Sequence, residues 1–274
     1  MKCAYVTLVM LGNYYVKGAI ALAKSLHRSG TDHDLICMVT EDVTYKKKLK
    51  KLYTRVITVP YIYFSCGKML TERQRKLYNH WINFSFTKWR CFELILYDRC
   101  IYLDADHIVL RNIDHLFKYN HAMCFNYNYN AEFINFNQGH VITPEVHKFI
   151  IDNYKLLAFT GTMVFTPNTY FFNVIMSLLN KNNKLLNDSK NIFNNGYDEI
   201  VLAQALIETN TKVVQLSPMY VWNAGDYDTL KRSTSQPYVI NYYGDIKPWS
   251  RRAADQYMDV YIWKYFYRTK NLTK

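Results

Sequence analysis

Apolar positions in the first sixty residues switch between two patterns. Residues 4–10 form a continuous apolar run of strand length, which is typical of a strand covered on both faces. From residue 14 to 27 the apolar positions recur at helical spacing, and Ser29-Gly30 is a stop signal, so we predict a helix there. The alternation continues with a strand at 35–40, a basic helix at 46–53 and a strand at 56–59.

Later segments repeat this alternation. Residues 126–137 are rich in Asn and Tyr without clear periodicity, so we predict a loop. Strands that alternate with helices indicate parallel pairing and an α/β layered fold. The predicted helices are 89–96, 170–179, 198–208 and 253–267, and the predicted strands are 99–103, 122–125, 163–166, 213–216 and 238–242.

Length and composition point to one domain. The chain has 274 residues, of which 50% are hydrophobic, and no linker or composition shift divides it, so we expect a single domain over 1–274. The first apolar run, about nine residues before Gly12, is too short to span a membrane and lacks a small-residue cleavage site. Cys3, Cys37 and Cys124 lie in apolar runs without metal-binding spacing. They predict free buried thiols and a cytoplasmic location.

The formal net charge is +12, which suits nucleic acid, an acidic membrane or a small anionic substrate. Part of it lies in one lysine run, which we interpret as the solvated face of a helix. The run lacks the aromatic and basic interleaving of a single-strand binding groove, so nucleic acid is disfavoured as a partner. A basic surface-binding protein remains an alternative. The run comprises Lys46, Lys47, Lys48, Lys50 and Lys51.

The most informative motif is Asp104-Ala105-Asp106, which follows the apolar strand at 99–103. On an extended backbone, residues i and i+2 point to the same face, so both carboxylates can meet one cation. Strand ends are also where ligands bind in α/β sheets. Hard oxygen ligands suit Mg²⁺ or Mn²⁺. The alternative is an ordinary Asx turn at the end of a strand.

A second candidate lies near the C-terminus. The strand at 238–242 leads to Gly244, which allows a close backbone approach, and Lys247 follows in a turn fixed by Pro248. A lysine there could neutralise a diphosphate leaving group. The alternative is an exposed lysine in a surface turn.

Together these segments resemble the family-8 retaining glycosyltransferases, in particular glycogenin, galactinol synthase and the small glycogenin-like proteins of large insect viruses. The resemblance runs from Tyr5 to Trp249, with the motifs in the family's order. The segments that carry it are Tyr5-Val6-Thr7-Leu8, Tyr15-Val16-Lys17-Gly18-Ala19, Ile101-Tyr102-Leu103-Asp104-Ala105-Asp106, Asn112-Ile113-Asp114-His115-Leu116-Phe117 and Gly244 to Trp249.

The resemblance implies a GT-A-type, Rossmann-like fold with a mostly parallel central sheet. It implies a retaining hexosyltransferase that uses a UDP-sugar, UDP-glucose or UDP-galactose, and Mn²⁺ or Mg²⁺. The acceptor would be a hydroxyl group of a glycan, an inositol-like polyol or a protein tyrosine. It also raises the expectations of a homodimer and, for a viral protein, of the host cytoplasm.

The resemblance also implies roles for individual residues. Thr7, Leu8 and Tyr15 would contact uridine, and Lys88 would contact the donor. Asp104, Ala105 and Asp106 would lie against the diphosphate, with both carboxylates on the metal and Lys247 gripping the diphosphate. Gly161 and Gly244 would line the donor site. Asp198 would position the transferred sugar or act as nucleophile, or it is simply a carboxylate that stabilises a helix N-terminus.

Two positions depart from the family pattern. Asn241 stands where the family has a histidine as third metal ligand, and an amide oxygen can ligate Mg²⁺ or Mn²⁺. The family's Asn-[Ser/Ala]-Gly aligns either with Phe159-Thr160-Gly161, which we prefer, or with Asn137-Gln138-Gly139. On the preferred alignment 137–158 is an insertion, and the segment 126–158 would shape the acceptor side. These departures keep open an inactive family member that binds sugar nucleotide or glycan.

Overall fold

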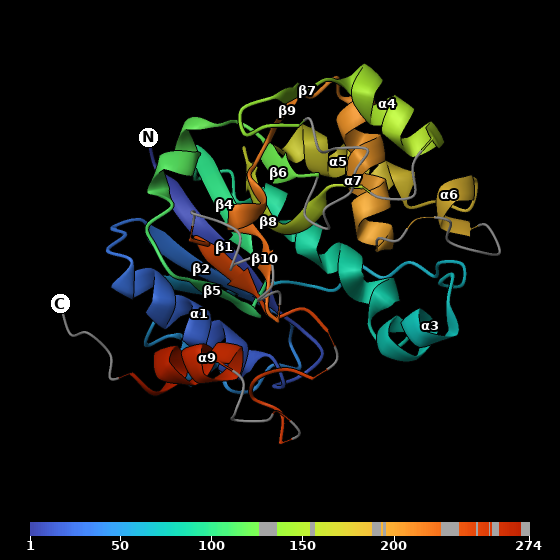
Figure 1. Cartoon of the computed structure of the whole chain (residues 1–274). Coiled ribbons are helices and arrows are strands. Elements are labelled where there is room, and N and C mark those ends of the chain that lie inside the picture. The colour runs from blue at the N-terminus through green and yellow to red at the C-terminus, as the bar shows by residue number, and fades with distance from the viewer. Residues whose placement is uncertain are drawn as a thin grey trace.

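The computed structural model describes residues 1–125, 136–153, 157–187, 193, 196–225, 236–244, 246–251, 253 and 258–269. Across these ranges eight strands form one sheet, in the order β3-β2-β1-β4-β8-β6-β9-β7 (Figure 1). The strands are β1 (Cys3–Val9), β2 (Asp34–Val39), β3 (Arg55–Thr58), β4 (Arg99–Leu103), β6 (Ala122–Cys124), β7 (Val141–Ile142), β8 (Phe159–Phe165) and β9 (Val213–Gln215).

Strand direction in this sheet is mostly parallel, as predicted. β3, β2, β1 and β4 pair in parallel, and β6 pairs in parallel with β9. Strand β8 is antiparallel to both β4 and β6, and β7 is antiparallel to β9. The expectation of parallel pairing is therefore wrong for β8, and β7 was not predicted as a strand. The spacing of hydrophobic residues along the chain identifies a strand but does not show whether it pairs in parallel or antiparallel.

Both faces of β1 are buried, which confirms the interpretation of its apolar run. Cys3, Tyr5 and Val9 belong to the hydrophobic cluster that includes α1 (Val16–Arg28). Val6 and Leu8, on the opposite face, belong to the cluster with η1 (Ile82–Glu93), α5 (Thr169–Leu178) and α7 (Tyr197–Glu208). Helices therefore cover the sheet on both sides, as Figure 1 shows.

A second, three-stranded sheet lies beside the first. It has the order β10-β11-β5 and consists of β10 (Trp222–Asn223), β11 (Val239–Asn241) and β5 (His107–Val109). Strand β11 was predicted at 238–242, whereas β5 and β10 were not, because two or three residues give no readable period. The antiparallel pairing of β5 with β11 brings the Asp104-Ala105-Asp106 segment next to the C-terminal segment.

The remaining helices agree in part with the predictions. The predicted helix 89–96 is the end of a longer 3₁₀ helix, η1, and 46–53 is helical only over α2 (Lys46–Leu49), whose lysines face outward as expected. The predicted loop 126–137 and the start of the C-terminal helix fall largely outside the described residues. The other helices are α3 (Glu72–Tyr78), η2 (Asp114–Lys118), α4 (Pro144–Asn153), α6 (Lys184–Asn187), η4 (Pro218–Tyr220) and α9 (Met258–Arg268).

The six cysteines are free, and five of them are buried. In the part of the chain that the structure describes, none of the helices is both long enough and apolar enough to cross a membrane.

Candidate active site

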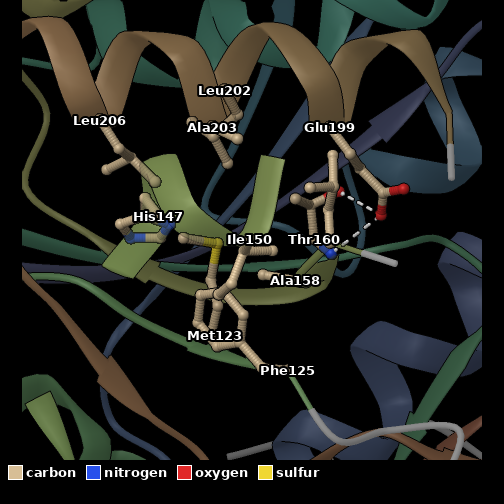
Figure 2. A pocket seen from close by; sticks show the side chains of 11 residues that line it. Met123, Phe125, His147, Ile150, Ala158, Thr160, Glu199, Leu202, Ala203 and Leu206 are labelled. Atoms are coloured by element: carbon tan, nitrogen blue, oxygen red, sulfur yellow. Dashed lines mark hydrogen bonds between the residues drawn. The ribbon is translucent and has the colours of Figure 1, made fainter. Parts of the chain in front are cut away.

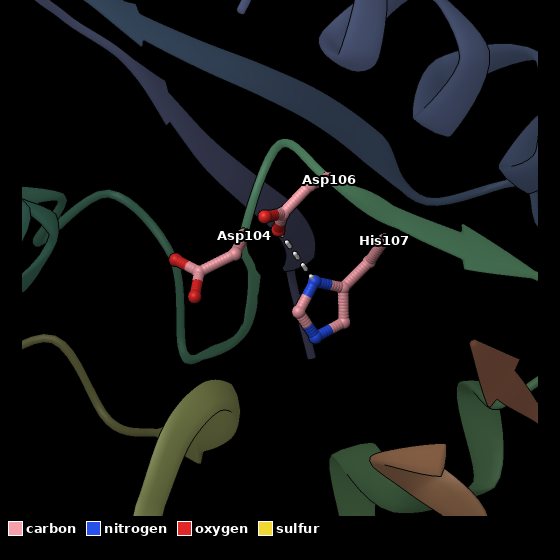
Figure 3. Close-up of side chains that lie close together, drawn as sticks. All are labelled: Asp104, Asp106 and His107. Atoms are coloured by element: carbon pink, nitrogen blue, oxygen red, sulfur yellow. Dashed lines mark hydrogen bonds and ion pairs between the residues drawn. The ribbon is translucent and has the colours of Figure 1, made fainter. Parts of the chain in front are cut away.

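The Asp104-Ala105-Asp106 segment forms a tight turn between β4 and β5. The backbone N–H of Asp104 donates to the carbonyl of Gly161 (2.9 Å), and that of His107 donates to the carbonyl of Asp104 (3.0 Å). One carboxylate oxygen of each aspartate and one ring nitrogen of His107 lie within 4.8 Å of one another (Figure 3). The turn thus brings the two predicted carboxylates together and adds an imidazole.

Lys247 lies on this turn. Its Nζ donates to Oδ2 of Asp106 (2.6 Å) and to the carbonyl of Tyr242 (2.8 Å), and the residue is only 6% exposed. An ordinary exposed lysine is therefore excluded. Burial alone would raise the pKa of Asp106, but the charge of Lys247 holds it well below its usual value. In return, Asp106 outweighs the effect of burial and raises the pKa of Lys247.

Lys88 lies close to the carboxylates of Asp104 and Asp198. From η1 its buried Nζ donates to Oγ1 of Thr160 (3.0 Å) and lies 3.4 Å from Oδ1 of Asp104 and 4.0 Å from Oδ2 of Asp198. Burial lowers the pKa of Lys88, but the neighbouring carboxylates outweigh it and raise the pKa overall. This ammonium thus carries its charge between Asp104 and Asp198.

Asp198 lies buried in the first turn of α7. Burial raises the pKa of its carboxyl group, against the opposing charge of Lys88. The helix start is held by the next residue, Glu199, whose carboxylate accepts from the backbone N–H of Gly196 (3.0 Å) and that of Thr160 (3.2 Å). Asp198 is therefore both a helix N-terminal carboxylate and part of the charged cluster.

The start of α1 packs against the same turn. The Tyr15 ring lies edge-on to Trp249 with ring centroids 5.3 Å apart, and Nζ of Lys247 lies 5.7 Å from the Tyr15 ring centre. A Cβ on Gly18 would collide with the carbonyl oxygen of Ala105 and lie 2.8 Å from Trp249. Only glycine allows this approach, so Gly18 fixes the distance between α1 and the turn.

Thr7 and Leu8 lie near the end of β1, the parallel neighbour of β4. Both side chains are buried, and Oγ1 of Thr7 has no hydrogen-bond partner among the described residues. The adjacent carboxyl ends of β1 and β4 place these residues close to the Asp104 turn.

The two glycines predicted to line the donor site differ. A Cβ on Gly161 would lie 2.7 Å from Oδ2 of Asp104, which places Gly161 in the cluster. Gly139, of the alternative alignment, bonds to Gln215 beside the sheet edge. Gly244 has φ +99°, and no described protein atom lies within 4 Å of a built Cβ, so its approach to the donor stays a prediction. Glycine is required there by the backbone conformation.

Asn241 is the register partner of His107 across β5 and β11, and its Nδ2 donates to Oδ1 of Asn223 (3.0 Å).

Sequence reasoning missed His107, Thr160 and Glu199 as members of the site. A signal existed for His107, which directly follows Asp104-Ala105-Asp106. Nothing in the sequence marked Thr160 as the contact of Lys88.

A small cavity lies beside this cluster, lined by residues of β6, α4, β8 and α7 (Figure 2). It has about 10 Å³ of room for the centre of a water molecule, enough for about one water and far too little for a sugar. Figure 2 shows the hydrogen bonds of Glu199 to Thr160 at its edge. The cavity is therefore not the site of the donor sugar.

A mostly parallel α/β sheet with a carboxylate and lysine cluster at its strand ends agrees with the GT-A-type fold that the resemblance implied. The sequence model of glycosyl transferase family 8 matches residues 6–253. The chain therefore belongs to glycosyl transferase family 8, as the resemblance implied.

Similar proteins include viral, plant and animal members. A protein of unknown function from Acanthamoeba polyphaga mimivirus is 38% identical over 117 residues, which are 42% of this chain and 40% of that protein. UDP-glucuronate:xylan alpha-glucuronosyltransferase 1 of Arabidopsis thaliana is 26% identical over 90% of this chain and 32% of its own. Glycogenin-1 of Oryctolagus cuniculus is 35% identical over 42% of this chain and 34% of its own. The matches thus span well under half of these relatives.

Solved structures confirm the fold. The galactosyltransferase LgtC, in complex with donor and acceptor sugar analogues, has a TM-score of 0.59 at 13% identity, over 96% of this chain and 95% of its own. The glycosyltransferase GlyE of Streptococcus pneumoniae has a TM-score of 0.58 at 14% identity, over 98% of this chain and 61% of its own.

Proposed function

We propose that this chain is a retaining glycosyltransferase that moves a hexose from a UDP-sugar, UDP-glucose or UDP-galactose, to a hydroxyl acceptor. The observation that carries the proposal is the cluster of Asp104, Asp106, Lys88 and Lys247 at the strand ends of a GT-A fold. Two buried ammonium groups beside two carboxylates suit a ligand that is itself a metal-bound diphosphate.

The donor would lie over the ends of β1 and β4. Thr7, Leu8 and Tyr15 are proposed to hold the uridine, with the Tyr15 ring stacked on the base. Gly161 and Gly244 would line the sugar and diphosphate.

The ligand atoms that the turn offers suit a divalent cation. Asp104 and Asp106 supply hard oxygen ligands within reach of one ion, and the amide oxygen of Asn241 is the third candidate. Either Mn²⁺ or Mg²⁺ fits this set. When bound, the cation would stabilise negative charge on the diphosphate as a Lewis acid.

In the transfer step the bond from the anomeric carbon to the diphosphate oxygen breaks, and the acceptor oxygen bonds to that carbon. The acceptor proton passes to the departing diphosphate. Lys247 would hold the charge that grows on the leaving group. Asp198 would orient the sugar for attack from the same face, or attack the anomeric carbon itself and then be displaced from it by the acceptor oxygen. Lys88 favours the ionised form of Asp198 in either role.

The acceptor side is proposed to include the segment 126–158. We keep a glycan, an inositol-like polyol and a protein tyrosine as acceptors. A single domain over 1–274, a homodimer and a cytoplasmic location, of the host if the protein is viral, complete the proposal.

A panel of UDP-sugars with Mn²⁺, scored for UDP release with and without myo-inositol, tests the proposal. UDP-glucuronate belongs in the panel because a relative's name specifies it. We expect release from one donor above the others, and none from Asp104→Asn. Release from no donor, or equal release from the variant, would contradict the proposed reaction.

A second candidate is binding without turnover. Asn241 in place of histidine favours it, and so does the Phe159 ring, which lies against Gly161 beside Asp104. In that case the cation would tighten UDP binding, but no UDP-sugar would be hydrolysed even slowly.

A further inference from the structure

The imidazole of His107 is buried without a complete set of hydrogen bonds. The residue is 0% exposed, its Nδ1 lies 3.3 Å from Oδ1 of Asp106, and its Nε2 has no partner among the described residues. The nitrogen that faces the carboxylates is Nδ1, so the imidazole is placed to share a cation with Asp104 and Asp106.

We infer that His107 is a nitrogen ligand of the cation that Asp104 and Asp106 would hold, binding through Nδ1. This inference rests on the proposed function. In Figure 3 the His107 ring points its Nδ1 toward the Asp106 carboxylate, from the strand that begins directly after the turn.

The distances suit one small cation. One oxygen of Asp104, one of Asp106 and a ring nitrogen of His107 lie within 4.8 Å of one another. Two ligands on opposite sides of a cation with bonds of about 2.1 Å are at most about 4.2 Å apart, so a contraction below about 1 Å would bring these atoms onto one ion.

The surroundings fix the ring in this orientation. Phe159 stacks on the imidazole with centroids 5.9 Å apart and an angle of 23°. The backbone N–H of His107 is held by Asp104, and Lys247 takes the other oxygen of Asp106, Oδ2, so that Oδ1 remains on the side of the imidazole. A ring held in place by its neighbours loses little freedom when it binds a metal.

His107 and Asn241 face each other in the register of β5 and β11. Directly opposite residues of an antiparallel pair project to the same face, so both positions serve the same part of the site. His107 on β5 would therefore supply an imidazole at this site, although Asn241 on β11 supplies only an amide. Asn241→Ala is the comparison variant, because it removes the other candidate ligand and leaves His107 in place.

Pulsed EPR of Mn²⁺ with UDP, on the full chain, tests the inference. Wild-type protein should show the modulation of a directly bound ¹⁴N, and labelling with ¹⁵N-histidine should replace that pattern. Labelling changes no residue, so folding does not limit this arm. His107→Gln should abolish the modulation and weaken Mn²⁺ binding at least about tenfold, whereas Asn241→Ala should keep the modulation.

Each other outcome counts against the inference. Tight, UDP-dependent Mn²⁺ binding without histidine modulation overturns the role of His107 and leaves the proposed function intact. Modulation that survives in His107→Gln assigns the nitrogen to another residue. Absence of any Mn²⁺ binding overturns both this ligand and the cation of the proposed function.

Discussion

The ammonium of Lys247 lies 2.6 Å from Oδ2 of Asp106, although 141 residues separate the two positions. The pair fastens the C-terminal segment to the Asp104-Ala105-Asp106 turn. It also neutralises a carboxylate that would otherwise be buried without a counter-charge. The same ammonium is the group that we propose to face the diphosphate, so this contact links the stability of the ligand-free protein to its function.

We expect Lys247→Met to lower the free energy of unfolding by about 3 kcal/mol at pH 7, because the substitution leaves the Asp106 carboxylate buried and unpaired. Denaturant unfolding in the presence of a chelator measures the loss. As a control, the double variant with Asp106→Asn should lose less than the sum of the two single variants. Additive losses would mean that the two residues do not interact.

The same pair predicts a pH dependence. Asp106 has a lowered pKa when folded, so its contribution is complete above the unfolded value of about 4 and is lost as the pH falls below it. Lys247 has a raised pKa, so its contribution is lost only at alkaline pH, above about 10. The stability gap between wild type and Lys247→Met should therefore be largest near neutral pH and shrink as the pH falls, beginning above about pH 4 because burial raises the pKa of the unpaired Asp106 in the variant. A gap that grows in acid would contradict the ion pair.

The sequence was sufficient for the first half of the sheet because β1 is apolar on both faces and α1 has a regular period. It failed for η1, where Phe86, Trp89 and Phe92 recur every three residues, the period of a 3₁₀ helix. Helix α3 was missed although Thr71 and Gln74 form a capping box that the sequence displays.

The site was predicted better than the contacts that hold it. Asp104, Asp106 and Lys247 stand in recognisable motifs, so their meeting was expected. Pairings between distant segments follow from tertiary register, which no local pattern specifies. The contact of Lys88 with Thr160, which lie 72 positions apart, is of this kind.

Lys247 should contribute more to turnover than to donor binding. A charge-assisted contact is worth about 1.5–3 kcal/mol, and the leaving group carries more charge in the transition state than in the bound donor. Lys247→Ala should lower kcat by about tenfold or more and lower UDP-sugar affinity by a smaller factor. Steady-state kinetics and donor titration on the same preparation provide both values. Equal losses would indicate uniform binding.

Lys88 should determine the pH below which kcat/KM for donor hydrolysis is lost. Its positive charge opposes the rise in the pKa of Asp198 that burial causes. Lys88→Met removes this charge, so the pKa of Asp198 should rise and activity should be lost at a higher pH than in wild type. The pH dependence of kcat/KM for donor hydrolysis reports the shift. Lys76→Met, at an exposed ion pair, is the control that should leave this pH unchanged.

Gly18→Ala should displace the Asp104-Ala105-Asp106 turn from helix α1. The added methyl group would meet the Ala105 carbonyl and the Trp249 ring, so we expect a loss of about 1–3 kcal/mol in stability and weaker UDP binding. Lys17→Ala, at an exposed position of the same helix, is the matched control. Thermal unfolding and UDP titration of both variants test this. Wild-type behaviour of Gly18→Ala would mean that the turn is not held by α1.

Calorimetric titration of UDP with Mn²⁺ or with a chelator tests the central claim most directly. If Asp104 and Asp106 hold a cation against the diphosphate, Mn²⁺ should tighten UDP binding to wild type at least about tenfold, which is about 1.4 kcal/mol. The same titration of Asp104→Asn, with its fold checked by circular dichroism, should show no effect of the metal. Equal UDP affinity with Mn²⁺ and with chelator in the wild-type protein would contradict the metal-dependent donor site.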